Sequence, residues 1–129
     1  MAGKDAEQPS IEYQRTEDFT EAYANNVFLE QSAWDLKLVF GQLDQTGGRI
    51  TVQQHTAVTL PWAQAKIFSY WLRGFVTVYE MTNGKIPILP STIPPELPPP
   101  TEELKKSEPH AEEIYAVFNK LRNKLVAGL

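Results

Sequence analysis

Residues 34–40 read Trp-Asp-Leu-Lys-Leu-Val-Phe, and this stretch decides the fold. Its apolar side chains recur at every second position, namely at Trp34, Leu36, Leu38 and Phe40. Asp35 and Lys37 stand between them. A period of two is typical of a strand that buries one face and exposes the other to water. The stretch therefore predicts a half-buried β-strand.

Two further strands are predicted on either side of this one. Before it, from Tyr23 to Leu29, the apolar side chains fit a strand with apolar content on both faces. After it, Asp44-Gln45-Thr46-Gly47-Gly48 offers two glycines for the positive φ angles of a hairpin turn. Apolar and β-branched residues then follow at a period of two, at Ile50, Val52, Thr56, Val58 and Leu60. The second and third strands should form a hairpin.

A long helix is predicted next, from Pro61 to about Met81. Pro61 ends the strand and suits the first turn of a helix, where no N–H is required. Thr82-Asn83-Gly84 marks the end, because glycine readily takes the left-handed conformation of a helix C-cap. The predicted class is α+β, with a three-stranded antiparallel sheet packed by one long helix in the order β-β-β-α.

This helix carries more apolar surface than one sheet needs. A wheel at about 100° per residue predicts that one stripe covers the sheet, formed by Ala65, Phe68, Leu72, Phe75, Val76 and Tyr79. Ile67, Trp71 and Val78 widen the apolar arc to roughly 180°, beyond the usual 100° or so. Either the chain's own tail or C-terminal helix covers the surplus, or it is a subunit or partner interface. The candidate interface is Ile67, Trp71, Phe75 and Val78.

The last third of the chain is predicted to be a spacer followed by a second helix. Residues 90–100 are rich in proline and favour an extended polyproline conformation. Ser107 is expected to cap an amphipathic helix over about 108–127, whose apolar stripe is Ile114, Val117, Phe118, Leu121 and Leu125. The predicted organisation is a disordered segment at 1–19, an α+β domain at 20–89, a linker at 90–106 and the C-terminal amphipathic helix at 107–129.

Composition limits the classes of function. The 129 residues carry a net charge of -4 and no cysteine, which excludes disulfide frameworks and thiolate chemistry. No segment is basic enough to indicate nucleic-acid binding, and no apolar run is long enough to cross a membrane. We expect a soluble, cytoplasmic protein. Because a core of roughly 70 residues is only marginally sufficient, we also expect a homodimer or a larger homo-oligomer.

No set of residues predicts catalysis, a metal site or a cofactor. His55 is expected to be a solvent-facing or hydrogen-bonded sheet histidine, and His110 a surface residue. The pairs Glu102-Glu103 and Glu112-Glu113 point about 100° apart on a helix, so they fit solvated charges better than a ligand set. Asn25 and Asn26 are unusual in a strand; a β-bulge or a sheet edge explains them better than a ligand contact.

A set of spaced residues resembles a family of short prokaryotic proteins known as a domain of unknown function. The set comprises Tyr23-Ala24-Asn25-x-Val27, Asp35-Leu36-x-Leu38-x-Phe40-Gly41, Leu60-Pro61, Ala65-Lys66, Leu72, Val76, Tyr79-Glu80 and Gly84-x-Ile86. The resemblance covers about residues 20–88 and implies no catalytic residues. The order of three strands and a long helix is also similar, at fold level, to bacterial export chaperones, which have a fourth strand that this sequence lacks.

The sequence thus predicts a non-catalytic protein-binding or assembly module of the chaperone or adaptor class. Its first contact is the long-helix set Ile67, Trp71, Phe75 and Val78. The second is the C-terminal stripe of Ile114, Phe118, Leu121 and Leu125, acting as a tethered ligand or lid. A nucleic-acid-binding module is the alternative, and a small enzyme ranks third.

Overall fold

The computed structural model describes residues 9–129. The chain divides into two compact units, Met1–Phe68 and Ser69–Leu129, and each is described by itself. The predicted disorder at 1–19 lies partly, at residues 1–8, outside the described residues. The predicted limits of the α+β domain, 20–89, stay a prediction.

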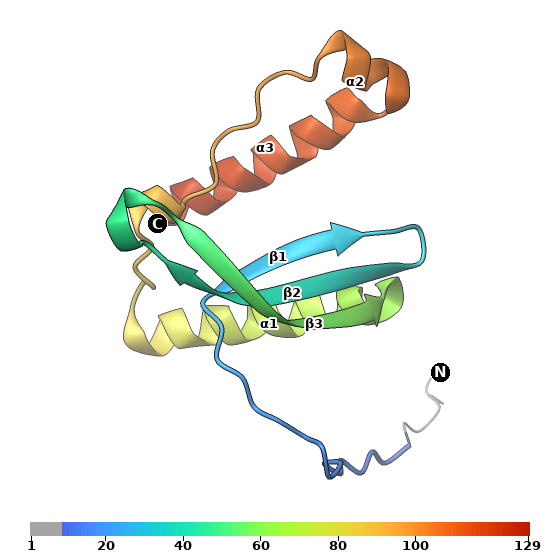
Figure 1. Cartoon of the computed structure of the whole chain (residues 1–129), viewed down its shortest axis with the longest axis vertical. Coiled ribbons are helices and arrows are strands. Elements are labelled where there is room, and N and C mark those ends of the chain that lie inside the picture. The colour runs from blue at the N-terminus through green and yellow to red at the C-terminus, as the bar shows by residue number, and fades with distance from the viewer. Residues whose placement is uncertain (1–8) are drawn as a thin grey trace, which may run out of the picture. The chain divides into compact units, whose positions relative to one another are not determined.

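The first unit is built on a three-stranded antiparallel sheet in the order β1-β2-β3 (Figure 1). Its strands are β1 (Asn26–Gln31), β2 (Asp35–Asp44) and β3 (Thr51–Pro61). A long helix, α1 (Trp62–Asn83), follows directly. The predicted α+β class and the β-β-β-α order are therefore confirmed.

The first strand is shorter than predicted. It begins at Asn26 and not near Tyr23, because Asn25, the residue before it, is not part of the regular strand pairing. There the Asn25 Oδ1 atom accepts a hydrogen bond of 2.6 Å from the Leu43 amide, while the Asn25 amide donates to the Gly41 carbonyl. Asn25 thus satisfies backbone groups at the end of the sheet, in agreement with the sheet-edge interpretation.

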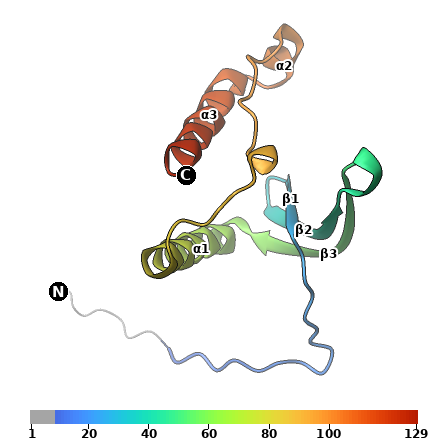
Figure 2. The same cartoon turned by 90° about the vertical axis from the view of Figure 1, so that its left-hand side faces the viewer.

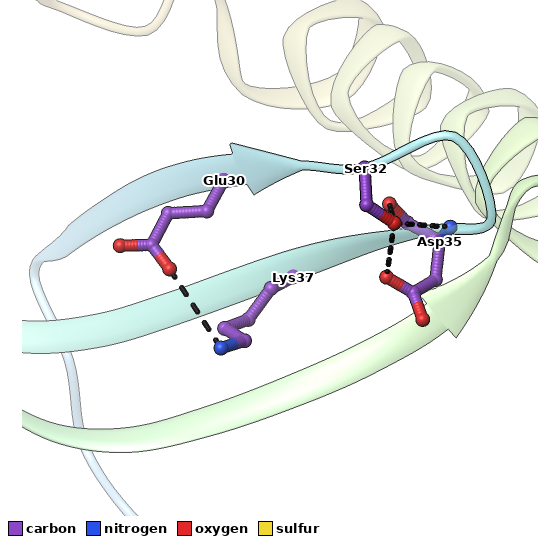
Figure 3. Close-up of polar contacts among 4 residues, drawn as sticks. All are labelled: Glu30, Ser32, Asp35 and Lys37. Carbon is purple, nitrogen blue, oxygen red and sulfur yellow. Dashed lines mark hydrogen bonds and ion pairs between the residues drawn. The ribbon is translucent and has the colours of Figure 1, made fainter.

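A serine organises the turn between β1 and β2 (Figure 3). The Ser32 Oγ atom accepts hydrogen bonds from the amides of Trp34 and Asp35, both at 3.1 Å, and donates to the Asp35 Oδ1 atom at 2.9 Å. Next to the turn, Glu30 and Lys37 are cross-strand partners whose charged groups lie 3.7 Å apart. These local bonds fix the register of the hairpin.

The turn between β2 and β3 is the predicted glycine turn. A short 3-10 segment, η2 (Thr46–Gly48), contains Gly47 and Gly48 with φ angles of 67° and 76°. Side chains other than glycine rarely adopt this left-handed region. The predicted hairpin is confirmed.

One prediction about β3 is wrong, because the strand contains a β-bulge. Phe40 pairs with Thr56 but Gly41 pairs with Gln54, which leaves His55 as an extra residue. An extra residue reverses the alternation of side chains beyond it. Val52, predicted on the face of Val58 and Leu60, therefore lies on the opposite face, paired with Leu43.

The two faces of the sheet are both apolar near the middle of β2. Leu38 and Val39 are adjacent, so they point to opposite faces, and both are buried. On the face of Leu38, the first turns of α1 add Gln64 and Phe68 to Phe40, Val58 and Leu60 around a hollow of about 210 Å³. Ala65 of α1 is buried as well. The helix therefore begins over this face.

Both ends of α1 are secured by hydrogen bonds. At its start, the Trp62 indole Nε1–H donates to the Ser32 carbonyl at 3.0 Å. At its end, Gly84 takes a φ of 88° and its amide donates to the Glu80 carbonyl, which confirms the predicted glycine cap. The Glu80 carboxylate accepts a 2.8 Å hydrogen bond from the Ile86 amide. No helix within residues 9–129 is long and apolar enough to cross a membrane.

The C-terminal part contains one helix that was not predicted. After a 3-10 turn, η3 (Pro90–Thr92), comes α2 (Glu102–Ser107), within the predicted linker, and then α3 (Ala111–Ala127). Thr101 caps α2 with its side chain, and its first turn carries Glu102 and Glu103. Ser107 is the last residue of α2, so it does not cap α3 as predicted. Its hydroxyl donates to the Leu104 carbonyl instead.

A lysine links the two C-terminal helices. The Lys105 ammonium of α2 lies 3.0 Å from a Glu112 carboxylate oxygen of α3 and 3.5 Å from a Glu102 carboxylate oxygen. The hydrogen bond to Glu112, together with the charge of Glu102, raises the pKa of Lys105. The charged form is therefore favoured, and this contribution to folding is lost only as the pH rises through that raised pKa.

The close approach of β3 at the bulge predicts that a side chain at position 41 destabilises the protein. A Cβ atom there would lie 2.8 Å from both the Gln53 carbonyl oxygen and the Val52 Cγ1 atom. Gly41→Ala should therefore lower the free energy of unfolding by about 1 to 3 kcal/mol, as overpacking does. Urea unfolding followed by circular dichroism measures the loss.

Gly74, in the middle of α1, is the matched control, because a Cβ atom there meets nothing within 4 Å. Gly74→Ala should raise the free energy of unfolding by about 0.5 to 1 kcal/mol through helix propensity. A Gly41→Ala protein as stable as the parent chain would contradict the close approach of β3 at the bulge.

Candidate protein-binding surfaces

The exposed apolar surface of α1 is centred on a glycine. Gly74 leaves a hollow of about 540 Å³ on the helix surface, bordered by Tyr70, Trp71, Phe75 and Val78, with Arg73 and Thr77 at one side. The rings of Tyr70 and Trp71 meet edge to face, with centroids 5.1 Å apart. The helix thus presents a concave apolar surface with an aromatic wall.

The side chains around this hollow are exposed. Trp71 keeps 56% of its surface accessible, Phe75 71% and Val78 58%. Ile67, one turn before Trp71 on the same side of the helix, is half exposed. Of the stripe predicted to cover the sheet, Ala65 is buried, whereas Leu72, Phe75, Val76 and Tyr79 are all exposed. Most of the apolar side chains on α1 are therefore exposed.

The chain's own C-terminal parts lie along a different side of α1. Within the second unit, Leu72 and Val76 of α1 share an open groove of about 730 Å³ with Ile86, Ile88, Leu121 and Leu125. The Lys85 ammonium also donates to the Gly128 carbonyl at 2.7 Å. None of these C-terminal residues lines the Gly74 hollow. In the second unit, the tail and α3 therefore flank the Leu72 side and not the Trp71 side.

The stripe predicted on α3 is present but divided between two surroundings. Leu121 and Leu125 line the groove with α1, and together with Phe118 they also line a smaller hollow against the proline segment. Phe118 is 58% exposed, and Ile114 is exposed as well. The structure does not bring this stripe to the Gly74 hollow, since α1 residues alone line that hollow.

The proline segment is held against α3 and is not a free spacer. The Asn119 Oδ1 atom accepts from the Leu97 amide at 2.8 Å, and the Asn119 Nδ2 atom donates to the Leu97 carbonyl at 3.2 Å. The Arg122 Nε atom donates to the Pro94 carbonyl at 3.1 Å. Figures 1 and 2 both show the segment between η3 and α2 running alongside α3. We call this arrangement the Asn119 clamp.

Sequence reasoning missed several of these residues, although two left a signal. A glycine in the middle of a helix, as at Gly74, usually has a packing or functional reason. Thr101 followed by two glutamates is a typical helix start. Asn119 left no such signal, because an exposed helix asparagine has no pattern that indicates a distant backbone partner.

The two histidines lie in different places and make local polar contacts. His55, in the bulge, approaches the Tyr23 carbonyl with its Nε2 atom at 3.0 Å and the Thr56 Oγ1 atom with its Nδ1 atom at 2.7 Å. His110 is exposed and lies 3.5 Å from a Glu113 carboxylate oxygen. Within residues 9–129, no three His, Cys, Asp or Glu side chains gather closely enough to hold a metal ion.

A comparison with protein families matches residues 1–88 to the family described as "Protein of unknown function (DUF3467)". The chain belongs to this family. No curated protein and no solved structure matches the sequence. The resemblance drawn from the spaced residues between Tyr23 and Ile86 is thereby confirmed, whereas the similarity to export chaperones stays a prediction.

Several residues that carry the DUF3467 resemblance have structural tasks. Asn25 bonds to the backbone at the end of the sheet, Gly41 allows the bulged strand to approach, and Ala65 is the buried residue of α1. Glu80 and Gly84 stabilise the end of α1. Each of these tasks depends on hydrogen-bonding capacity or on small size. At these positions, the residues on which the resemblance was based serve the fold.

The Asn119 clamp predicts the exchange behaviour of one amide. Asn119→Ala removes both hydrogen bonds to Leu97, so the Leu97 amide should exchange with solvent at least tenfold faster, as NMR hydrogen exchange would measure. Asn119→Asp keeps the acceptor for the Leu97 amide but places a carboxylate oxygen against the Leu97 carbonyl, so the exchange rate should lie between those of Asn119→Ala and the parent chain. Lys120→Ala, at the next and exposed position of α3, is the control. Unchanged exchange in Asn119→Ala would contradict the clamp.

Proposed function

We propose that this chain is a non-catalytic protein-binding module, of the adaptor or chaperone class, that takes apolar segments of other proteins on α1. The observation that supports the proposal is the exposed hollow at Gly74, bordered by Tyr70, Trp71, Phe75 and Val78. Large exposed apolar patches on small proteins usually mark contact surfaces, and Trp and Tyr are enriched among the residues that contribute most to binding.

The shape of the surface favours an apolar side chain of the partner as the group that is bound. A glycine at the centre allows the partner to approach the helix axis more closely than any other residue would. The surrounding aromatic rings can bury a leucine or phenylalanine from several sides. Arg73 and Thr77, at one side of the hollow, offer hydrogen bonds to the partner's backbone. Ile67 extends the same surface by one turn of α1.

In this proposal the α3 stripe of Ile114, Phe118, Leu121 and Leu125 is a second contact. It serves as a tethered lid or ligand, connected to α1 through the segment that begins at Lys85. The Asn119 clamp shortens the reach of this tether, because the proline segment is folded back along α3. A module of this kind would work in the cytoplasm, in keeping with the cysteine-free composition.

Trp71→Glu tests the proposal. The probe is a fluorescently labelled lysozyme that has been reduced and carboxymethylated, so that it stays unfolded and exposes apolar segments. The full chain should bind it, and Trp71→Glu should weaken binding at least tenfold, because a charge replaces a central aromatic contact. Fluorescence anisotropy measures the affinity.

Ser69→Glu is the matched control. It introduces the same charge into the same helix, but on the side that lines the groove with α3. It should bind like the parent chain, while circular dichroism shows that both variants keep their helix. Equal binding by Trp71→Glu and the parent chain, or no binding of the probe at all, would overturn the proposed function. Binding of single-stranded DNA that weakens steeply with salt would favour the nucleic-acid alternative.

A further inference from the structure

A second surface of a different kind lies at the edge of the sheet. Strand β1 is the first strand in the order β1-β2-β3, so it pairs with β2 on one side, and within residues 9–129 no strand pairs with its other side. Exposed edges invite pairing, and proteins usually protect them with proline, lysine, a bulge or a covering segment. Strand β1, whose sequence is Asn-Val-Phe-Leu-Glu-Gln, contains none of the first three.

The other edge of the sheet, formed by β3, has features that protect against pairing. Strand β3 carries the bulge at His55 and ends at Pro61, and its sequence is largely polar. By contrast, Val27, Phe28 and Leu29 of β1 are consecutive, apolar and each more than half exposed. The chain before β1 leaves the edge at Asn25, whose side chain bonds to β2. The β1 edge is therefore both open and apolar.

The hydrogen-bonding pattern indicates which amides of β1 point outward. The Ser32 amide donates to the Asp35 carbonyl, so the even-numbered residues of β1 face β2. Backbone groups alternate along a strand. The N–H and C=O groups of Val27 and Leu29 therefore point away from the sheet, at the middle of the edge.

We propose that the β1 edge binds the β1 edge of a second copy of this chain, antiparallel, with Phe28 opposite Phe28 of the second copy. The pairing joins two three-stranded sheets into one continuous sheet. It requires no change of backbone, because the outward groups of Val27 and Leu29 already alternate as a ladder requires.

The sequence of β1 selects this register. With Phe28 at the two-fold axis, Val27 lies opposite Leu29 of the second copy, and Asn26 lies opposite Glu30, so an amide can donate to a carboxylate. Centring on Glu30 would oppose two carboxylates, and centring on Leu29 would place Phe28 against a glutamate. About Phe28, the strand thus opposes apolar residues to apolar residues and an amide donor to a carboxylate acceptor.

The pairing also continues the apolar faces of each sheet. Val27 and Leu29 are the cross-strand partners of Phe40 and Leu38, on the face over which α1 begins. Phe28 lies on the opposite face beside Val39. In the dimer, each apolar row would extend across the two-fold axis, and two phenylalanine rings would meet at close spacing, where opposed residues do not exchange hydrogen bonds.

The oligomeric state of the full chain tests the proposal. Sedimentation equilibrium should give twice the monomer mass of 14.6 kDa. Phe28→Lys and Phe28→Glu should each weaken association at least tenfold, because like charges would be opposed at the axis. An equimolar mixture of the two variants should recover the dimer. The proposal would be overturned if the chain stayed monomeric at all concentrations up to about 100 μM, which is well above the dissociation constants of ordinary specific complexes.

Cysteine substitution gives an independent result, since the chain contains no cysteine. Opposed residues of a pair that does not exchange hydrogen bonds have Cα atoms about 4.5 Å apart, within the range of a disulfide. Oxidised Phe28→Cys should therefore cross-link with itself. Asn26→Cys and Glu30→Cys should cross-link when mixed, and neither should do so alone. Self-linkage of Glu30→Cys, without linkage of Phe28→Cys, would contradict the register.

This surface and the α1 surface can be tested separately. Trp71→Glu should leave the dimer mass unchanged, while Phe28→Lys should leave binding of the unfolded probe to α1 within about twofold. A dimer that Trp71→Glu dissociates and that Phe28→Lys leaves intact would overturn the β1 interface. Failure of the probe to bind would overturn the proposed function and leave the sedimentation result unaffected.

Discussion

Strand β2 pairs with a strand on each side, and the rest of the first unit depends on that double pairing. It supplies two buried apolar side chains, Leu38 and Val39, one on each face. At Gly41 it lacks a side chain, so the bulged part of β3 can approach closely enough to pair. Without that approach, β3 could not continue its ladder past His55, and Val52 could not join the face of Leu43. A single small residue thus permits the change of face that the hairpin requires.

Much of this architecture could be predicted from the sequence, because the signals are local. The period of two at Leu36–Phe40, the two glycines at 47–48 and the glycine cap at 84 each act within a few residues. The bulge could not be predicted, since it depends on how β2 and β3 meet and not on any pattern within β3. The same holds for Glu80 and Asn119, whose partners are backbone groups of Ile86 and Leu97. Side chain to backbone bonds over such separations leave no periodic signal.

The candidate site was predicted in part. The width of the apolar arc on α1 indicated Ile67, Trp71, Phe75 and Val78, and each is exposed. The hydrophobicity pattern did not indicate the hollow, because Gly74 has no side chain and so adds nothing to such a pattern. Tyr70, next to Trp71, was not included in the predicted set. In the second unit, the α3 residues Leu121 and Leu125 line the groove beside Leu72 and Val76 and do not line the Gly74 hollow. Two apolar surfaces, one on α1 and one at the β1 edge, are therefore exposed within the part of the chain that the structure describes.

The Asn119 clamp has a consequence for how the proline segment can move. The two hydrogen bonds of Asn119 involve only the main chain of Leu97, so they do not depend on its side chain, but they require an N–H at this position. The next three residues, Pro98, Pro99 and Pro100, have none. If the segment slid along α3 so as to bring any of these to Asn119, one of the two hydrogen bonds would be lost. The three prolines thus disfavour sliding of the segment in that direction, because none of them can donate the hydrogen bond that the Leu97 amide donates to Asn119.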